Sequence, residues 1–377
     1  MLEEPSVPSH PYLHPSIMSE TIYLGIDLGT SRTSIAASTG FRKTISSYVG
    51  YPKDYVSKKK LGGRDIIYGQ EAVENRLSLN LYRPLAGSNI KGTGGSNSPE
   101  VNKAIKDLLE HAIDQVNAPT DATIFAVIGS PATTSTAGKA TILEAAAACT
   151  DSVIVCSEPF AVAYSLDFFD ESLVIDVGAG TTDLCRVQGT LPAEGDQRTL
   201  TDAGDAIDEL LGQLIKEKHP NAQFSAHMIR AIKERHASVS NRMDEVEEIL
   251  PVGGKPTVFN LTEEIYKACQ SIVPPIVAAL HDLIAKSDPE FQAKLRNKIL
   301  LAGGGSQIRG LARTIEKALV DFGGGKVTQI DDPQFAGADG ALKIALDMPL
   351  DYWAEFTMKR GLANRRMSGL ATTPPPE

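Results

Sequence analysis

Apolar and polar residues follow two patterns along this chain, and together they predict an α/β fold. Short apolar runs with strand periodicity occur at residues 21–26, 43–49 and 173–177. Residues 99–118 and 226–239 instead place apolar side chains three and four positions apart, which is the spacing of one helix face. Since strands and helices alternate, we expect mixed sheets with helices packed against them.

One strand-and-turn pattern occurs in both halves of the chain. Residues 25–33 read GIDLGTSRT, and residues 174–183 read VIDVGAGTTD. Each is an apolar run that reaches an Asp and continues into a glycine-containing turn with hydroxyl side chains. A chain that makes this element twice is expected to fold as two related halves that close on one polyphosphate from both sides.

The residue types in these turns suit a phosphate held together with a cation. Glycine permits positive φ and lets backbone N–H groups approach phosphate oxygens closely. Asp27 and Asp176 would repel a phosphate unless a hard cation such as Mg²⁺ stood between them. A single copy of the pattern would be read as an ordinary hairpin turn, but two copies in matching strand contexts favour phosphate binding.

The composition is that of a soluble globular protein with two or more domains. The chain has 377 residues, of which 42% are hydrophobic and 22% are charged. Its net charge of −10 argues against broad nucleic-acid or anionic-membrane binding. No run approaches the ~18 apolar residues of a membrane span. The four cysteines lack metal-type spacing and favour a reducing cytoplasm.

Both ends of the chain are expected to lie outside the folded core. Residues 1–17 are rich in proline and lack the apolar run of a signal peptide. Met18 is a second plausible start, so residues 1–19 are interpreted as a disordered leader. The proline-rich end also predicts disorder, and we assign residues 350–377 to a flexible tail.

Three further segments carry candidate chemistry. Glu158 begins a predicted helix between the two turns, where it is either a partner of the helix dipole or a carboxylate that positions water beside a phosphate. Residues 303–305 are glycines that join a strand to a helix, which suits a nucleotide contact as well as an ordinary connection. Lys233 and Glu234 fit either a solvated helix face or contacts to an adenosine.

Other common active-site types are not indicated. The seven histidines have no metal-ligand spacing. Neither the nucleophile elbow G-x-S-x-G nor the P-loop pattern G-x-x-x-x-G-K-[ST] occurs. The sequence therefore does not indicate a metalloenzyme built on histidines, an elbow-type serine hydrolase or a P-loop NTPase.

Five segments taken together resemble, in type and spacing, the five nucleotide motifs of the actin, heat-shock-chaperone and sugar-kinase ATPase superfamily. They are Asp27–Thr33, Glu158–Tyr164, Asp176–Asp183, Gly204–Asp208 and Gly303–Gly310. Within that superfamily the chain is similar to bacterial actins, and above all to those of magnetotactic bacteria. This similarity is carried by Val49–Asp54, Val155–Phe160, Ile175–Cys185, Leu301–Leu311 and Asp332–Trp353.

The resemblance implies an actin-like fold of two similar α/β domains around a central nucleotide cleft, each domain with a small subdomain. In the first domain, subdomain IA would span residues 20–48 and 96–170, and subdomain IB residues 49–95. In the second domain, subdomain IIA would span residues 171–205 and 261–349, and subdomain IIB residues 206–260.

The resemblance also implies ATP or ADP with Mg²⁺ in the cleft. Glu158 and Asp176 match catalytic positions for water activation and metal-linked hydrolysis. Asp27 and Asp176 match metal positions, with Asp27 acting through water. The nucleotide contacts that the resemblance implies are Gly29, Thr30, Ser31, Arg32, Gly178, Gly180, Thr181, Thr182, Gly204, Asp205, Asp208, Lys233, Glu234, Gly303, Gly304 and Gly305.

The function implied by the resemblance is that of an ATP-hydrolysing, filament-forming actin in the cytoplasm. Subunits would stack head to tail, a contact that propagates without closing. The filaments would align magnetosomes through magnetosome-associated adaptor proteins, and hydrolysis would drive their turnover. Neither nucleic-acid binding nor direct membrane insertion is expected.

Other members of the superfamily remain alternatives. A sugar or acetate kinase would need an acceptor site with an Asp base, and the small insertions offer no obvious substrate lid. A chaperone ATPase would need a β-rich peptide-binding domain after residue 350. A rod-shape, division or plasmid-segregation actin is a further alternative, and a basic amphipathic tail around Trp353 could tether a division filament to membrane.

Overall fold

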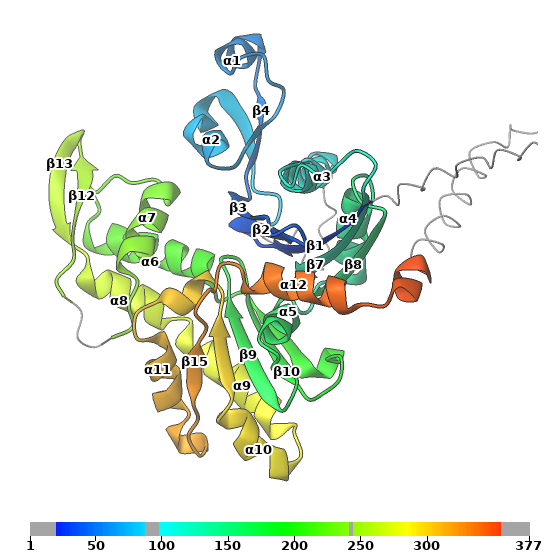
Figure 1. Cartoon of the computed structure of the whole chain (residues 1–377). Helices are drawn as coiled ribbons and strands as arrows, with labels where there is room; N and C mark the ends of the chain where they lie inside the picture. The colour runs from blue at the N-terminus through cyan, green and yellow to red at the C-terminus, as the bar shows by residue number, and fades with distance from the viewer. Residues whose placement is uncertain (1–19, 87–97, 241–243, 356–377) are drawn as a thin grey trace, which may run out of the picture.

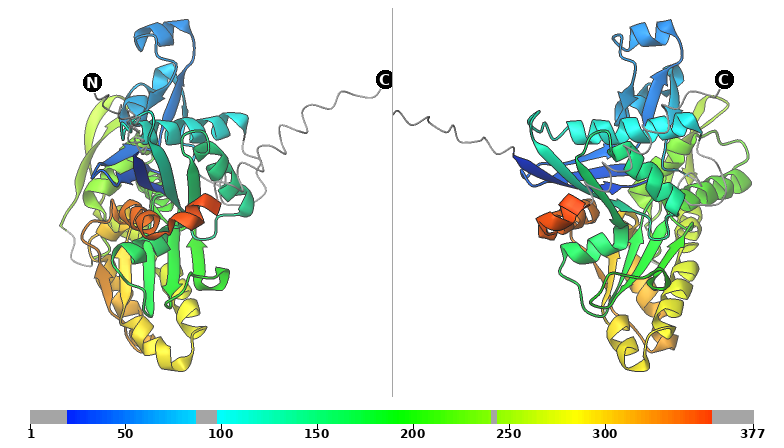
Figure 2. Two further views of the ribbon diagram at one scale, coloured as in Figure 1. Left: turned by 45° about the vertical axis from the view of Figure 1, so that its right-hand side comes forward. Right: turned by 90° about the vertical axis from the view of Figure 1, so that its right-hand side faces the viewer.

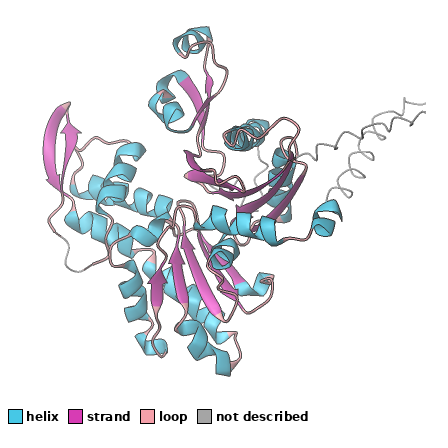
Figure 3. Cartoon of the chain, viewed as in Figure 1, coloured by secondary structure: helices cyan, strands magenta, loops and turns pink. Residues whose placement is uncertain are grey.

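The computed structural model describes residues 20–86, 98–240 and 244–355. The predicted leader and residues 356–377 of the predicted tail lie outside the described residues. Figure 1 shows two large sheets, one above the other, with helices between them and on their outer sides. Figure 3 shows the same arrangement coloured by secondary structure.

The first sheet has the strand order β3-β2-β1-β7-β8. Strand β1 pairs antiparallel with β2 and parallel with β7. This combination arises because a tight turn joins β1 to β2, whereas a long crossover with a helix leads to β7. The strands are β3 (Arg42–Ser46), β2 (Arg32–Ala37), β1 (Thr21–Leu28), β7 (Thr123–Ser130) and β8 (Ser152–Ser157).

The second sheet repeats this plan with the order β11-β10-β9-β14-β15. Its central strand β9 pairs antiparallel with β10 and parallel with β14, as β1 does with β2 and β7. The duplicated sequence pattern therefore marks equivalent hairpins in two similar sheets. The strands are β11 (Gln197–Leu200), β10 (Thr182–Val187), β9 (Ser172–Val177), β14 (Ile299–Ala302) and β15 (Val327–Gln329).

Each sheet has its own apolar core. Helices α3 (Pro99–Asp114) and α4 (Thr136–Ala146) supply the first core, where Ile105 packs with Ile26 and Ile128 of the strands. The second core contains Ile175 of β9 together with side chains from several helices. Those helices are α6 (Gly204–Lys218), α8 (Thr262–Gln270), α9 (Val273–Ala285), α10 (Pro289–Arg296) and α11 (Leu311–Ala318).

Among the described residues, the stretch Thr262–Ala285 alone has the length and hydropathy of a membrane-spanning helix. It comprises α8 and α9, and apolar side chains such as Ile265, Ile276 and Leu280 are fully buried in the second core. The pair therefore belongs to the interior of the fold.

Two small units extend the sheets on the side of the molecule away from α10 (Figures 1 and 2). The unit beside the first sheet is the three-stranded sheet β5-β4-β6 with two short helices. Its elements are β4 (Val49–Pro52), α1 (Tyr55–Lys60), β5 (Ile67–Tyr68), α2 (Gly69–Glu74) and β6 (Leu79–Tyr82).

The expectation of one strand over residues 43–49 is wrong. Strand β3 ends at Ser46, and β4 begins at Val49 in a different sheet. Ser47 lies between them with its hydroxyl 2.7 Å from the carbonyl oxygen of Gly29 and 2.9 Å from the hydroxyl of Thr33. These tertiary hydrogen bonds take the chain out of the first sheet at this point.

The unit beside the second sheet consists of α7 (Ala226–His236) and the hairpin of β12 (Glu247–Val252) with β13 (Lys255–Asn260). The helical spacing over residues 226–239 correctly predicts α7, although the helix ends three residues earlier than expected. The charged sequence that follows did not indicate the hairpin.

Two helices lie between the sheets and contact each other closely. They are α5 (Glu158–Ser165) and α12 (Ala336–Asp347). A Cβ atom on Gly340 of α12 would lie 1.8 Å from the carbonyl oxygen of Ala161 in α5. Likewise, a Cβ atom on Gly25 of β1 would lie 2.1 Å from the carbonyl oxygen of Ala338. Glycine at position 340 lets α12 pack backbone to backbone against α5, and glycine at position 25 lets it do the same against β1.

The predicted flexible tail begins too early at residue 350, because residues 350–355 are helical and Trp353 is fully buried. The indole ring stacks on Phe125 with ring centroids 4.8 Å apart, and its Nε1 donates to the carbonyl oxygen of Ala345 at 3.3 Å. The end of the described chain is thus anchored on the first sheet and α12.

Candidate functional site

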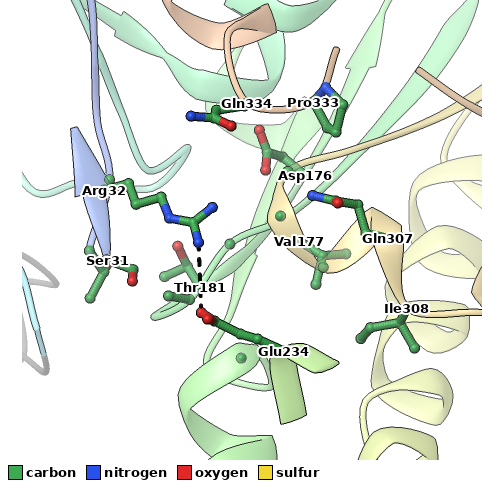
Figure 4. Close-up of a pocket in the computed structure, with 18 of the residues that line it drawn as sticks. Ser31, Arg32, Asp176, Val177, Thr181, Glu234, Gln307, Ile308, Pro333 and Gln334 are labelled. Atoms are coloured by element: carbon green, nitrogen blue, oxygen red, sulfur yellow. Dashed lines mark ion pairs between the residues drawn. The ribbon is translucent and has the colours of Figure 1, made fainter. Parts of the chain in front are cut away.

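A cavity of about 540 Å³ lies between the two sheets, lined by residues from both halves of the chain (Figure 4). Its size is typical of a site for a nucleotide-sized ligand. The strand ends β1 and β9 meet there, so both copies of the duplicated pattern contribute to one site.

The first glycine turn (residues 28–32) joins β1 to β2 and lines the cavity. A Cβ atom on Gly29 would lie 2.6 Å from the carbonyl oxygen of Arg32, so the turn is too tight for a larger residue. The hydroxyl of Ser47 stabilises the turn by donating a hydrogen bond to the carbonyl oxygen of Gly29.

The second glycine turn (residues 178–181) joins β9 to β10 and faces the first. The amide of Gly178 donates to the carbonyl oxygen of Thr181 at 2.8 Å, which closes the turn. A Cβ atom on Gly180 would lie 2.5 Å from Oγ1 of Thr30. The two turns therefore touch at this glycine, and a side chain there would push them apart.

Three carboxyl groups, those of Asp27, Glu158 and Asp176, line the cavity with Asp183 close behind them, and their charges oppose one another. Burial raises the pKa of Asp27 to about 6. Burial, followed by the charges of Asp27 and Asp183, raises the pKa of Asp176 well above its usual range. Burial, with smaller contributions from Asp27, Asp183 and Asp176, also raises the pKa of Glu158 well above its usual range. A bound cation would relieve this repulsion.

The acidic residues fit a cation that is held mainly by water and phosphate. Among the described residues, no group of three or more His, Cys, Asp or Glu side chains is arranged to hold a metal ion. Mg²⁺ is usually bound through one or two carboxylates plus phosphate oxygens and water, which is what Asp27 and Asp176 could offer. Glu158 has a buried Oε1 without a hydrogen-bond partner in the described part of the chain.

A third glycine segment crosses the end of β9. Gly303 has φ of +74°, and a Cβ atom there would lie 2.2 Å from Oδ1 of Asp176. A Cβ atom on Gly305 would lie 2.3 Å from Cγ1 of Val177, whereas Gly304 has open space around it. Two of the three glycines are thus required by the close approach to β9, and all three line the cavity.

Helix α7 forms another wall of the cavity with Lys233 and Glu234. The amino group of Lys233 donates to the carbonyl oxygen of Gly204 at 2.7 Å and pairs with Asp208 at 2.8 Å. Glu234 pairs with Arg32 of the first turn at 3.8 Å (Figure 4), and both side chains are about half exposed. Such an exposed pair contributes little to stability.

Most of the predicted site residues line this cavity, but four do not. Gly180 of the second turn packs against Thr30, and the hydroxyl of Thr182 donates to the carbonyl oxygen of Asp202 at 2.7 Å. Asp205 and Asp208 are engaged in ion pairs. The predicted residues that line the cavity are Asp27, Gly29, Thr30, Ser31, Arg32, Glu158, Asp176, Gly178, Thr181, Gly204, Lys233, Glu234, Gly303, Gly304 and Gly305.

The cavity also includes residues that were not predicted individually as nucleotide contacts, although Gln307 and Ile308 fall within the motif Gly303–Gly310. Gln307 and Ile308 lie on the opposite side of the cavity from Ser31 (Figure 4). Their position directly after the three glycines could have indicated them. Pro333 and Gln334 have no local signal, because the chain brings them to the cavity on its way from β15 to α12.

The sequence matches the family described as MreB/Mbl protein over residues 21–349. It is 39% identical over 335 residues to actin-like protein MamK of Magnetospirillum gryphiswaldense, covering 89% of this chain and 92% of the relative. A MamK-like protein of Paramagnetospirillum magneticum is 32% identical over 335 residues, covering 89% of this chain and 97% of that protein.

Solved structures agree with these relatives. A MamK double helical filament has a TM-score of 0.84 at 38% identity, covering 88% of this chain and 100% of that one. A non-polymerising MamK mutant bound to AMPPNP has a TM-score of 0.67 at 37% identity, covering 87% and 100%. MreB 5 of Spiroplasma citri, also bound to AMPPNP, has a TM-score of 0.70 at 19% identity and shows likeness of fold alone. The predicted actin-like α/β fold is confirmed.

Proposed function

Because this chain belongs to the MreB/Mbl family of actin-like proteins, we propose that it is an ATPase whose subunits assemble head to tail into cytoplasmic filaments. The observation that carries the proposal is the pair of glycine turns that face each other across one cavity, each beside a partly buried Asp. Filament formation by MamK and AMPPNP binding by a MamK mutant, in proteins 37–38% identical to this one, support it.

The chain's own groups suit the handling of a polyphosphate. Backbone N–H groups, including that of Thr30, and the hydroxyls of Ser31 and Thr181 would donate to phosphate oxygens, since all three residues line the cavity. Asp27 and Asp176 would hold Mg²⁺, with Asp27 acting through water. When bound, the cation would offset the phosphate charge. Lys233 and Glu234, with the third glycine segment, would contact the nucleoside.

Glu158 is the best-placed group to handle the attacking water. It is buried at the start of α5, between the two turns, and its Oε1 lacks a partner among the described residues. A carboxylate with a raised pKa is a better proton acceptor than an ordinary one. Glu158 would therefore orient the water and accept its proton, while the two turns hold the reacting phosphate in place.

The same reasoning extends to the cellular role and to the division of the chain. The division into subdomains IA, IB, IIA and IIB stays a prediction, and the two large sheets and two small units support it. Alignment of magnetosomes through adaptor proteins is proposed from the 38–39% identity to MamK. Head-to-tail contacts would use different surfaces of each subunit, so they would propagate as a filament.

The decisive experiment combines light scattering and electron microscopy of the purified protein with a phosphate-release assay. The protein is compared with ATP and Mg²⁺, with ADP, and without nucleotide. Filaments that need ATP, with phosphate release lagging behind assembly, are expected. Phosphate release without polymer, or transfer of the phosphoryl group to a sugar or acetate, would instead indicate a soluble ATPase or a kinase.

A further inference from the structure

A network of charged side chains crosses the rim of the cavity. Arg83, which follows β6, donates from Nη1 and Nη2 to the two carboxylate oxygens of Asp205 at 2.8 and 3.1 Å. Arg230 of α7 donates to the same carboxylate at 3.1 Å and to the hydroxyl of Tyr48 at 2.6 Å. Arg83 and Tyr48 come from the first half of the chain, and Asp205 and Arg230 from the second.

The Arg83–Asp205 pair is well shielded from water, since the two side chains are only 15% and 32% exposed. A fork-to-carboxylate pair of this kind fixes the geometry as well as the distance between its partners. Partial burial also reduces screening by salt. The pair is therefore a stronger link than the exposed pair between Arg32 and Glu234.

Each end of this pair is fixed to one of the glycine turns. On the first side, Nε of Arg83 donates to the carbonyl oxygen of Thr30 at 3.0 Å, and the hydroxyl of Thr30 donates to the carbonyl oxygen of Leu85 at 3.2 Å. On the second side, the backbone amide of Asp205 donates to the carbonyl oxygen of Ala179 at 2.7 Å. The ion pair therefore links the two turns through their backbones.

We propose that Arg83 is a positioning residue that sets the spacing of the two glycine turns and retains the nucleotide between them. Arg83 does not line the cavity, and it acts through its bonds to the backbone of Thr30 and the carboxylate of Asp205. The inference rests on the proposed function, because it takes a nucleotide to be the ligand of both turns. Loss of the pair lets the turns separate, so bound nucleotide escapes faster and hydrolysis slows.

The test measures how fast bound nucleotide exchanges, by stopped flow with mant-labelled ADP, in the full-length protein and its variants. Arg83→Gln removes the charge and the fork. Arg83→Lys keeps the charge but cannot reproduce the three directed bonds. Arg198→Gln is the matched control, because Arg198 pairs with Asp282 within the second half, where the Nε–Oδ2 distance is 2.9 Å.

Both Arg83 variants should exchange bound nucleotide at least about tenfold faster than the wild-type protein. Losing a hydrogen bond between charged groups typically changes an equilibrium constant by about ten- to a hundredfold. The control Arg198→Gln should exchange at the wild-type rate, even if its unfolding temperature falls equally. Adding Arg83→Gln to Asp205→Asn should change the exchange rate little further, because the carboxylate that Arg83 pairs with is then already gone.

Three results separate the possible failures. Wild-type protein that binds no mant-ADP would overturn the proposed function, and the inference with it. Nucleotide binding with unchanged exchange in both Arg83 variants would overturn the inference alone. Equal acceleration by Arg83→Gln and Arg198→Gln would also overturn it, because the effect would then reflect general destabilisation.

Discussion

Glycine residues around the cavity are required by the atoms that stand opposite them. Gly180 faces the hydroxyl of Thr30, and Gly303 faces the carboxylate of Asp176, each at a distance that no Cβ atom could occupy. The sequence indicated glycines for backbone access to phosphate. The structure adds a second reason, which is close packing: Gly180 lets the two halves contact each other, and Gly303 lets its segment cross the end of β9. That reason depends on tertiary neighbours and has no trace in the local sequence.

Replacing Glu158 with Gln should separate assembly from hydrolysis. The change keeps the volume of a buried side chain but removes its capacity to accept a proton, so phosphate release should fall roughly a hundredfold. Filament formation with ATP and Mg²⁺ should persist, as judged by light scattering. A variant that assembles normally and releases phosphate at the wild-type rate would show that Glu158 does not handle the water.

His111 should make stability depend on pH. Its ring stacks on Tyr68 with centroids 3.9 Å apart, and burial, together with the charge of Lys43, lowers its pKa from the usual value near 6.5. The unfolded chain therefore binds the proton more readily. This contribution to stability is fully present above pH 6.5 and is lost as the pH falls from there toward the lowered pKa.

The measurement is the free energy of unfolding in urea at several pH values between 5 and 7.5. Wild-type protein should lose stability faster than His111→Phe on acidification. Parallel curves for the two proteins would contradict the assignment. Asp114 opposes the shift in this region, so its replacement by Asn should steepen the dependence.

At the scale of elements, the predictable segments are those that bury one face. Helix α3 and strand β9 were indicated because their apolar residues follow a clear period. The β12–β13 hairpin was not, because its apolar residues do not all face the core: Leu250 is fully buried, whereas the paired Ile249 and Val258 are 60% and 57% exposed. Its one local signal is the pair Gly253-Gly254, both at positive φ, between two short runs.

The contact between α5 and α12 should be intolerant of any side chain at Gly340. In the variant Gly340→Ala the new Cβ atom would meet the carbonyl oxygen of Ala161, which is backbone and cannot swing away. Helix α12 must then move, and a loss of about 1–3 kcal/mol in unfolding free energy is expected.

The control for this substitution is Gly304→Ala in the third glycine segment, where nothing lies within 4 Å of the new atom. Urea unfolding of both variants, followed by circular dichroism, measures the difference. Equal stability of the two variants would mean that α5 and α12 are not packed as closely as described.

At the scale of the whole molecule, the sequence predicted that two equivalent halves share one ligand. That prediction was possible because the same strand-and-turn pattern occurs in both halves of the sequence. It did not reveal that Asp205 joins the halves through Arg83, since the partners lie far apart in the chain and no local motif marks their pairing.

Scanning calorimetry should show that nucleotide binding couples the unfolding of the two halves. The two sheets have separate apolar cores, so nucleotide-free protein is expected to unfold in two overlapping transitions. At about 100 times the dissociation constant, ATP with Mg²⁺ should add about 2.7 kcal/mol and merge the transitions. A shift in one transition alone would mean that a single half holds the nucleotide. The Glu158→Gln variant keeps the ATP intact during the scan.

Trp353 is the single tryptophan of the chain, and it lies between α12 and the first sheet with no exposed surface. The tryptophan fluorescence of the protein therefore comes from one site. Tyr23 can transfer excitation energy to it, because the two ring centroids are 6.5 Å apart. Any rotation of the halves that moves α12 against the sheet would change the wavelength and intensity of that emission. The unmodified protein thus carries its own optical reporter of domain movement.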